Sequence, residues 1–183
     1  MALFQKKKLQ NKLPVTIDLR DDYFFVNGKQ LTIPSRISDL TDIFGEPRLV
    51  ADRNKESKFQ KERICEKYNL SPDKYLEMDY YWDELGLLAL TYDKKTVHCF
   101  WIKIGDSRKY PMEMPKSDFT GALMINGRPW QDVVTEKGGT SGTFKLKLGK
   151  LHAWVVRYGP KVKDVKQFQV LLNDDEKLVF FDD

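Results

Sequence analysis

Two stretches in the first half of the chain decide its fold: LTDIFGEP at residues 40–47 and YYWDELGLL at residues 80–88. In the first, apolar residues recur at helical spacing up to Phe44, Gly45 suits the left-handed position after a helix, and Pro47 prevents the helix from continuing. In the second, three aromatic residues precede an acidic corner and an aliphatic run, which is typical of two strands joined by a turn. Together they predict an α+β domain in which one or two short helices pack against an antiparallel meander sheet.

The segment before this helix predicts a β-hairpin. Residues 15–19 alternate in the manner of a strand, and two further runs within residues 23–33 flank Asn27-Gly28. Asn-Gly is the preferred pair for a type I′ turn because both central residues need positive φ. Ser35 is the expected N-cap of the helix, which should span residues 36–44.

The rest of the chain predicts mostly strands. A charged excursion at residues 52–76 carries a second helix, and hydrophobic runs then alternate with turns. A second Asn-Gly pair at residues 126–127 repeats the surroundings of the first, which fits either a duplicated unit or two independent hairpins. The expected strands are 80–82, 87–92, 96–104, 119–125, 143–148, 151–158, 168–172 and 178–181, with loops at 105–117 and 136–142.

Length and charge predict one domain preceded by a basic arm. With 183 residues and 41% apolar content, the chain can bury one hydrophobic core over residues 14–183. The net charge of +4 comes from four lysines in residues 1–13, and without them 27 basic residues face 27 acidic ones. The flexible arm is therefore either a solvated tail or a salt-sensitive contact for nucleic acid or a membrane surface.

The chain offers no expected membrane span, cofactor or metal site. It lacks an apolar run of about 18 residues and a secretory signal, so we expect a cytoplasmic protein with Cys65 and Cys99 reduced. His98 precedes Cys99, but successive strand residues point to opposite faces of a sheet, so the two should not share an ion.

The raw material for an enzyme with a dispersed site consists of His98, Cys99, His152 and the adjacent carboxylates Asp83 and Glu84. The surroundings of Cys99 do not resemble a helix N-terminus or another activating arrangement. In an apolar strand, this cysteine is most simply a small core residue. The enzyme interpretation stays open as an alternative.

Aromatic and charged residues at strand ends are the candidates for contacting a protein partner. Trp82 should be buried, because aliphatic residues follow it, and the acidic corner beside it should be exposed and face the partner. Trp130 follows Arg128-Pro129 and is expected to be partly exposed. The complete set of candidate partner-binding residues is Tyr80, Asp83, Glu84, Arg128 and Trp130.

The order of these motifs also carries a resemblance. An Asn-Gly hairpin, a helix ending in Gly-x-Pro, a Trp-Asp-x-Leu-Gly segment, a Phe-Thr-Gly strand and a second Asn-Gly follow one another over roughly residues 17–130. In this order the chain resembles a group of small uncharacterised bacterial domains, and its helix-then-sheet arrangement is similar to the architecture of β-lactamase-inhibitor proteins and an outer-membrane assembly lipoprotein. The bacterial domains look like companions of polymorphic and contact-dependent toxins. The resemblance implies a non-enzymatic immunity protein that binds and neutralises a cognate toxin.

Overall fold

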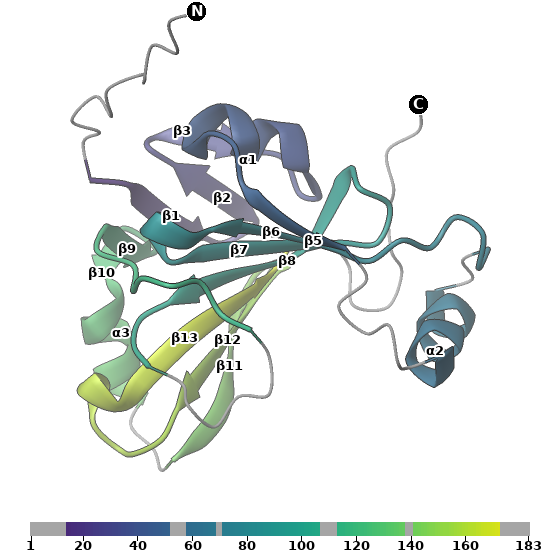
Figure 1. Cartoon of the computed structure of the whole chain (residues 1–183). Coiled ribbons are helices and arrows are strands. Elements are labelled where there is room, and N and C mark those ends of the chain that lie inside the picture. The colour runs from purple at the N-terminus through teal and green to yellow at the C-terminus, as the bar shows by residue number, and fades with distance from the viewer. Residues whose placement is uncertain (1–13, 52–57, 69–70, 107–112, 138–140, 173–183) are drawn as a thin grey trace, which may run out of the picture.

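The computed structural model describes residues 14–51, 58–68, 71–106, 113–137 and 141–172 of the chain. Three short α-helices and two 3₁₀ helices accompany thirteen strands in these ranges (Figure 1). The helices are α1 (Ile37–Phe44), α2 (Lys58–Tyr68), α3 (Trp130–Lys137), η1 (Asp83–Leu85) and η2 (Val162–Asp164). The strands are β1 (Thr16–Arg20), β2 (Tyr23–Val26), β3 (Lys29–Leu31), β4 (Ser35–Arg36), β5 (Arg48–Ala51), β6 (Met78–Trp82), β7 (Leu87–Thr91), β8 (Thr96–Lys103), β9 (Ala122–Ile125), β10 (Arg128–Pro129), β11 (Gly142–Leu148), β12 (Leu151–Arg157) and β13 (Val165–Leu171).

The strands form two sheets. One has the order β10-β9-β1-β2-β3, and the other has the order β11-β12-β13-β8-β7-β6-β5, with the short β4 also paired to β8. Most neighbours are antiparallel, which confirms the predicted α+β class. The prediction of one meander was incomplete, because β1 and β9 pair in parallel and belong to a separate five-stranded sheet.

Both Asn-Gly pairs form turns with positive φ, and both attach to β1. The side-chain Oδ1 of Asn27 accepts a hydrogen bond from the backbone N–H of Thr16 at 2.9 Å, and Oδ1 of Asn126 accepts one from Asp21 at 3.0 Å. The two turns therefore bind at opposite ends of β1. The two similar Asn-Gly segments therefore have the same structural role.

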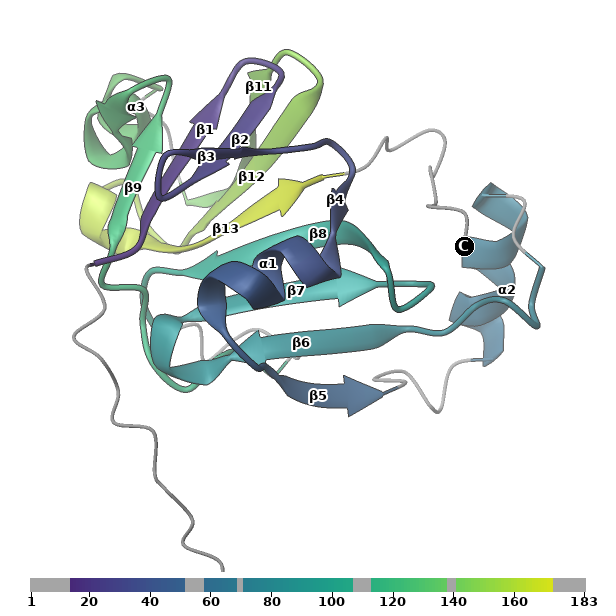
Figure 2. The ribbon, with the colours of Figure 1, turned by 90° about the horizontal axis from the view of Figure 1, so that it is seen from above.

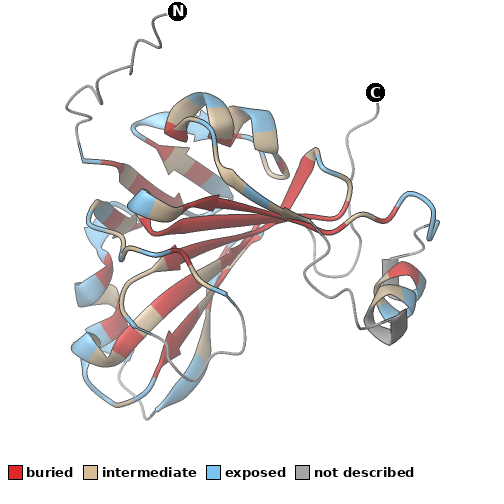
Figure 3. Cartoon of the chain, in the orientation of Figure 1, coloured by how far each residue is buried: buried red, intermediate tan, exposed pale blue. Residues whose placement is uncertain are grey.

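The main core lies between the five-stranded sheet with α1 and one face of the large sheet (Figure 2). The ring centroid of Phe24 in β2 is 5.6 Å from that of Phe100 in β8, and Phe44 at the end of α1 stacks 6.2 Å from the same ring. In another part of the same core, α3 places the Trp130 ring edge-on against Phe168 in β13. Buried residues concentrate on the central strands of the large sheet (Figure 3).

A second cluster forms on the opposite face of the large sheet. Alternate residues of its strands, including Tyr81, Leu88 and Trp101, point to this face and are almost fully buried. Helix α2 contributes Cys65 to this cluster, although the helix lies beyond the end of β6 and β7 (Figure 1). The large sheet therefore buries residues on both of its faces.

Several local predictions were wrong. Ser35 does not cap α1: it lies in β4, its hydroxyl donates to the carbonyl oxygen of Thr32, and Arg36 occupies the N-cap position. Helix α3 was not expected, and it extends into the loop predicted at 136–142. Trp130 is only 8% exposed, because as the first residue of α3 it turns into the main core.

The expectation that His98 and Cys99 point to opposite faces of the sheet is also wrong. A β-bulge pairs Leu90 with Cys99 but Thr91 with Val97, which leaves His98 as the extra residue. The His98 ring lies 4.9 Å from that of Tyr92, and Tyr92 belongs to the same buried cluster as Cys99.

The basic arm and the strand predicted at 178–181 lie outside the described residues. No helix among the described ranges is long and apolar enough to cross a membrane.

Candidate binding site at the corner of the large sheet

The two stretches that decide the fold meet at one corner of the large sheet. The indole Nε1–H of Trp82, the last residue of β6, donates a 2.7 Å hydrogen bond to the carbonyl oxygen of Gly45, just after α1. The ring of Phe44 packs edge-on against the same indole at 5.3 Å. Because Trp82 is 4% exposed, the prediction that it is buried is confirmed. Its role is to join the end of α1 to the end of β6.

A glycine allows the chain to turn sharply after η1. Gly86 has left-handed backbone angles, φ 69° and ψ 29°. A Cβ atom at this position would lie 2.4 Å from the backbone nitrogen of Phe119, so the segment before β9 also approaches too closely for a side chain. The turn at Gly86 and the close approach of the segment at Phe119 together fix the position of η1.

An open pocket of about 290 Å³ lies between these elements. Its walls combine apolar groups from the core with charged groups at the surface. Carboxylates come from both connections: one from the segment between α1 and β5 and two from η1. The lining residues are Phe44, Glu46, Arg48, Tyr81, Trp82, Asp83, Glu84 and Leu85. We refer to it as the corner pocket.

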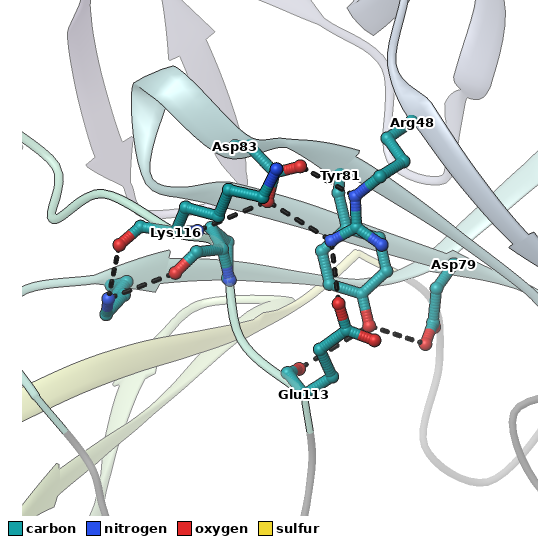
Figure 4. A network of polar contacts seen from close by, with 8 residues as sticks. Arg48, Asp79, Tyr81, Asp83, Glu113 and Lys116 are labelled. Carbon is teal, nitrogen blue, oxygen red and sulfur yellow. Dashed lines mark hydrogen bonds and ion pairs between the residues drawn. The ribbon is translucent and has the colours of Figure 1, made fainter.

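Arg48 organises one side of the corner pocket (Figure 4). Its Nε donates to Oδ2 of Asp83 at 2.6 Å and its Nη2 donates to Oδ1 at 3.2 Å, a two-bond pairing. Nη2 also lies 2.8 Å from Oε1 of Glu113. The guanidinium carbon is 4.2 Å from the ring centroid of Tyr81, over its face. Arg48 is therefore held by two carboxylates and one aromatic ring.

The network also fixes the chain that crosses the sheet at residues 113–118. Oδ1 of Asp83 accepts a 3.2 Å hydrogen bond from the backbone N–H of Lys116, and the carbonyl oxygen of Asp83 accepts one from Ser117. The hydrogen bonds from Arg48 lower the pKa of Asp83 and raise that of Arg48. Both groups are therefore charged at neutral pH, and the pair is a structural clamp.

Two other carboxylates in the corner pocket have no such partner. Glu46 and Glu84 are exposed, and neither forms a hydrogen bond or ion pair with any part of the chain that the structure describes. They come from different elements and border the same pocket. The clamp is thus satisfied internally, whereas these two charges face solvent.

The structure separates the five predicted partner-binding residues. Asp83 and Glu84 lie together at the corner pocket. Tyr80 is 8% exposed and points into the main core, where its hydroxyl donates to the carbonyl oxygen of Lys94. Arg128 is exposed in β10 but pairs with Glu136 of α3, and Trp130 is buried in the main core.

The register of the large sheet separates two of the candidate catalytic residues, Cys99 and His152. Across β8, β13 and β12 the register pairs Cys99 with Leu171, and Leu171 with His152. Two strand spacings separate the backbones of Cys99 and His152 by about 10 Å. Among the described residues, no group of three or more His, Cys, Asp or Glu side chains is placed to hold a metal ion.

Sequence reasoning missed four members of this site: Glu46, Arg48, Tyr81 and Glu113. Tyr81 lies within one of the two fold-deciding stretches, but Arg48 and Glu113 lie in segments without a recognisable pattern. The sequence indicated Glu46 only as part of the Gly-Glu-Pro segment that ends the helix. Its charge between Gly45 and Pro47, which end the helix, is the one local signal that could have indicated a surface feature.

Comparison with known proteins identifies a family but no function. No curated protein and no solved structure matches the chain. The family described as "Domain of unknown function (DUF7738)" matches residues 16–139, a region that includes every residue lining the corner pocket. The match ends before β11, β12 and β13, although β13 pairs directly with β8 in the large sheet. Since the match covers more than half of the sequence, the chain belongs to the DUF7738 family.

Proposed function

We propose that this chain is a non-enzymatic, cytoplasmic protein-binding module that neutralises a cognate bacterial toxin, and that it binds the toxin through the corner pocket and the adjoining β5 edge. One observation carries the proposal: a preformed pocket holds two carboxylates, Glu46 and Glu84, that have no partner within the described chain. Exposed charges at a rigid, partly aromatic hollow are suited to recognition of an oppositely charged partner.

The rigidity of the corner supports binding over a purely structural role. Trp82 fixes the end of α1, and the Arg48–Asp83 pair fixes both the start of β5 and the crossing segment. Because these groups are already ordered, a partner would lose little conformational entropy in ordering them. Tight binding through a few anchors then becomes attainable.

The neighbouring surface supports a partner with a basic surface. Helix α1 carries two aspartates and no basic residue, and Asp42 is exposed one turn before the pocket. Next to the pocket, β5 is the edge of the large sheet, and its Leu49 is 55% exposed. An acidic pocket beside an exposed apolar edge favours a partner with a basic surface, such as a toxin that acts on nucleic acid.

A capture experiment with charge-reversed variants tests this proposal. Tagged wild-type chain, Glu84→Lys and Asp73→Lys would be used to capture proteins from the native host at about 0.15 M salt. Asp73 is the matched control: it is exposed, carries the same charge, and lies before the opposite end of β6 from η1. We expect one protein to be retained by the wild type and by Asp73→Lys and lost from Glu84→Lys.

The captured protein must then behave as a toxin. Its gene expressed alone should arrest growth, and co-expression of the wild-type chain, but not Glu84→Lys, should restore it. A partner that does not arrest growth would overturn the neutralising role. Equal retention by Glu84→Lys and the wild type would exclude the corner pocket as the binding surface.

A further inference from the structure

We propose that the corner pocket binds an arginine side chain presented by the partner protein, with the guanidinium between Glu46 and Glu84 and the methylene stem against the apolar wall. This inference rests on the proposed function and names the group that the site recognises. It follows from the charge, the lining and the position of the pocket.

The balance of charge in the pocket favours a cation. Three carboxylates line it (Glu46, Asp83 and Glu84) against one guanidinium, that of Arg48. Arg48 does not compete for the two outer carboxylates, because it is engaged by Asp83 and by Glu113, which lies outside the pocket lining. Two negative charges therefore remain for a ligand.

The lining favours a cation with an apolar stem. Phe44, Trp82 and Leu85 supply the inner wall of the pocket, and the two aromatic residues are themselves held in place by their edge-on contact. A long basic side chain can place its methylene groups against such a wall while its charged end stays near solvent. A metal ion or a small ammonium ion would leave this apolar wall unused.

Arginine fits the pocket better than lysine. Its planar guanidinium has five N–H donors and is more weakly hydrated than an ammonium group, so it can bridge two carboxylates and still stack on an aromatic face. The same site contains an example of this pattern: Arg48 bonds two carboxylates while lying 4.2 Å from the centroid of the Tyr81 ring. The incoming arginine would repeat the arrangement with Glu46, Glu84 and the inner aromatic wall.

The sheet edge gives the partner a path to the pocket. The pocket lies at the start of β5, and no described strand pairs with the outer side of β5. An extended segment of the partner alongside this edge would contact the exposed Leu49 and bring a neighbouring side chain to the pocket. The occupant is thus an arginine in an extended segment of a basic protein.

Trp82 provides a direct reporter, because its indole N–H lies beside the pocket and gives its own signal in a ¹⁵N-correlated NMR spectrum. The probe is N-acetyl-arginine amide, and the control is the N-acetyl-citrulline amide, which has nearly the same shape but no charge. We expect the arginine probe to shift the Trp82 indole signal in a saturable manner, with a dissociation constant on the order of millimolar for so small a ligand. The indole signals of Trp101, Trp130 and Trp154 serve as internal references.

Substitutions that keep the shape of the side chains complete the test. Glu46→Gln with Glu84→Gln should weaken the arginine probe at least tenfold, while Asp73→Asn should leave its affinity unchanged. The proposal is refuted if citrulline and arginine shift the Trp82 signal equally, or if the double glutamine variant binds arginine as tightly as the wild type. If arginine fails to bind but the toxin is still lost from Glu84→Lys, the arginine assignment falls and the proposed function stands. If arginine binds but no toxin is captured, the arginine assignment stands and the proposed function falls.

Discussion

Reversing the charge of Asp83 should destabilise the protein, whereas the same change at the adjacent Glu84 should not. Asp83 accepts two hydrogen bonds from Arg48 and one from the backbone amide of Lys116. Its side chain is 12% exposed. Glu84 is exposed and has no such bonds within the described chain. The two carboxylates are neighbours in sequence, but only one of them belongs to the clamp.

The expected magnitude follows from these contacts. A hydrogen bond to a charged group contributes about 1.5–3 kcal/mol, but the side chain of Arg48 is 35% exposed and can be hydrated when its partner is lost. Removing the Asp83 carboxylate should therefore cost about 2 kcal/mol. A lysine in its place adds a like charge next to Arg48, worth about 1 kcal/mol more, so Asp83→Lys should cost about 3 kcal/mol. Glu84→Lys should stay within about 0.5 kcal/mol of the wild type.

Urea unfolding of the two variants measures this difference. The midpoint should fall for Asp83→Lys with an unchanged slope, since the surface exposed on unfolding is the same. A double-mutant cycle with Arg48→Met and Asp83→Asn should give a coupling free energy of about 1–2 kcal/mol. Equal stability of Asp83→Lys and Glu84→Lys would refute the clamp. The structure also corrects the expectation that the whole acidic corner is exposed, because Glu84 is exposed but the side chain of Asp83 is only 12% exposed and is bonded to Arg48.

Three further predictions concern the same corner. Arg48 lowers the pKa of Asp83 in the folded state, so the pair stabilises the fold fully above the ordinary aspartate pKa of about 4. This contribution is lost as the pH falls through the lower folded pKa. The drop in urea midpoint between pH 6 and pH 3 should therefore be smaller in Asp83→Asn than in the wild type. Trp82→Ala should cost about 3–5 kcal/mol in unfolding free energy, since it empties a buried site and removes the bond to Gly45, and a variant that melts like the wild type would contradict this role. Gly86→Ala should cost about 1–3 kcal/mol by the same measurement, because its Cβ would collide with the backbone of Phe119. Gly28→Ala is the control: no atom lies near its Cβ, so it should cost only the strain of its positive φ.

The sequence by itself determined several local elements of this protein. The Asn-Gly turns, the end of α1 before Pro47 and the strands from Met78 to Lys103 depend on φ preferences and side-chain alternation within a few residues. The burial of Trp82 was predicted from its place in an aromatic run shortly before Leu85 and Leu87. Such features can be predicted because the residues that cause them are adjacent in the chain.

Only the tertiary structure decided how these elements combine. The parallel pairing of β1 with β9 joins segments about a hundred residues apart, and it sets up the division into two sheets. The burial of Trp130 depends on its contact with Phe168 in β13 of the other sheet. Arg48 and Asp83 are separated by 35 residues and meet because β5 and β6 are antiparallel neighbours. The same pairing divides an acidic dipeptide into a clamped Asp83 and an exposed Glu84 next to Glu46. Local sequence preferences carry no information about such distant contacts, because they form only when the whole core packs.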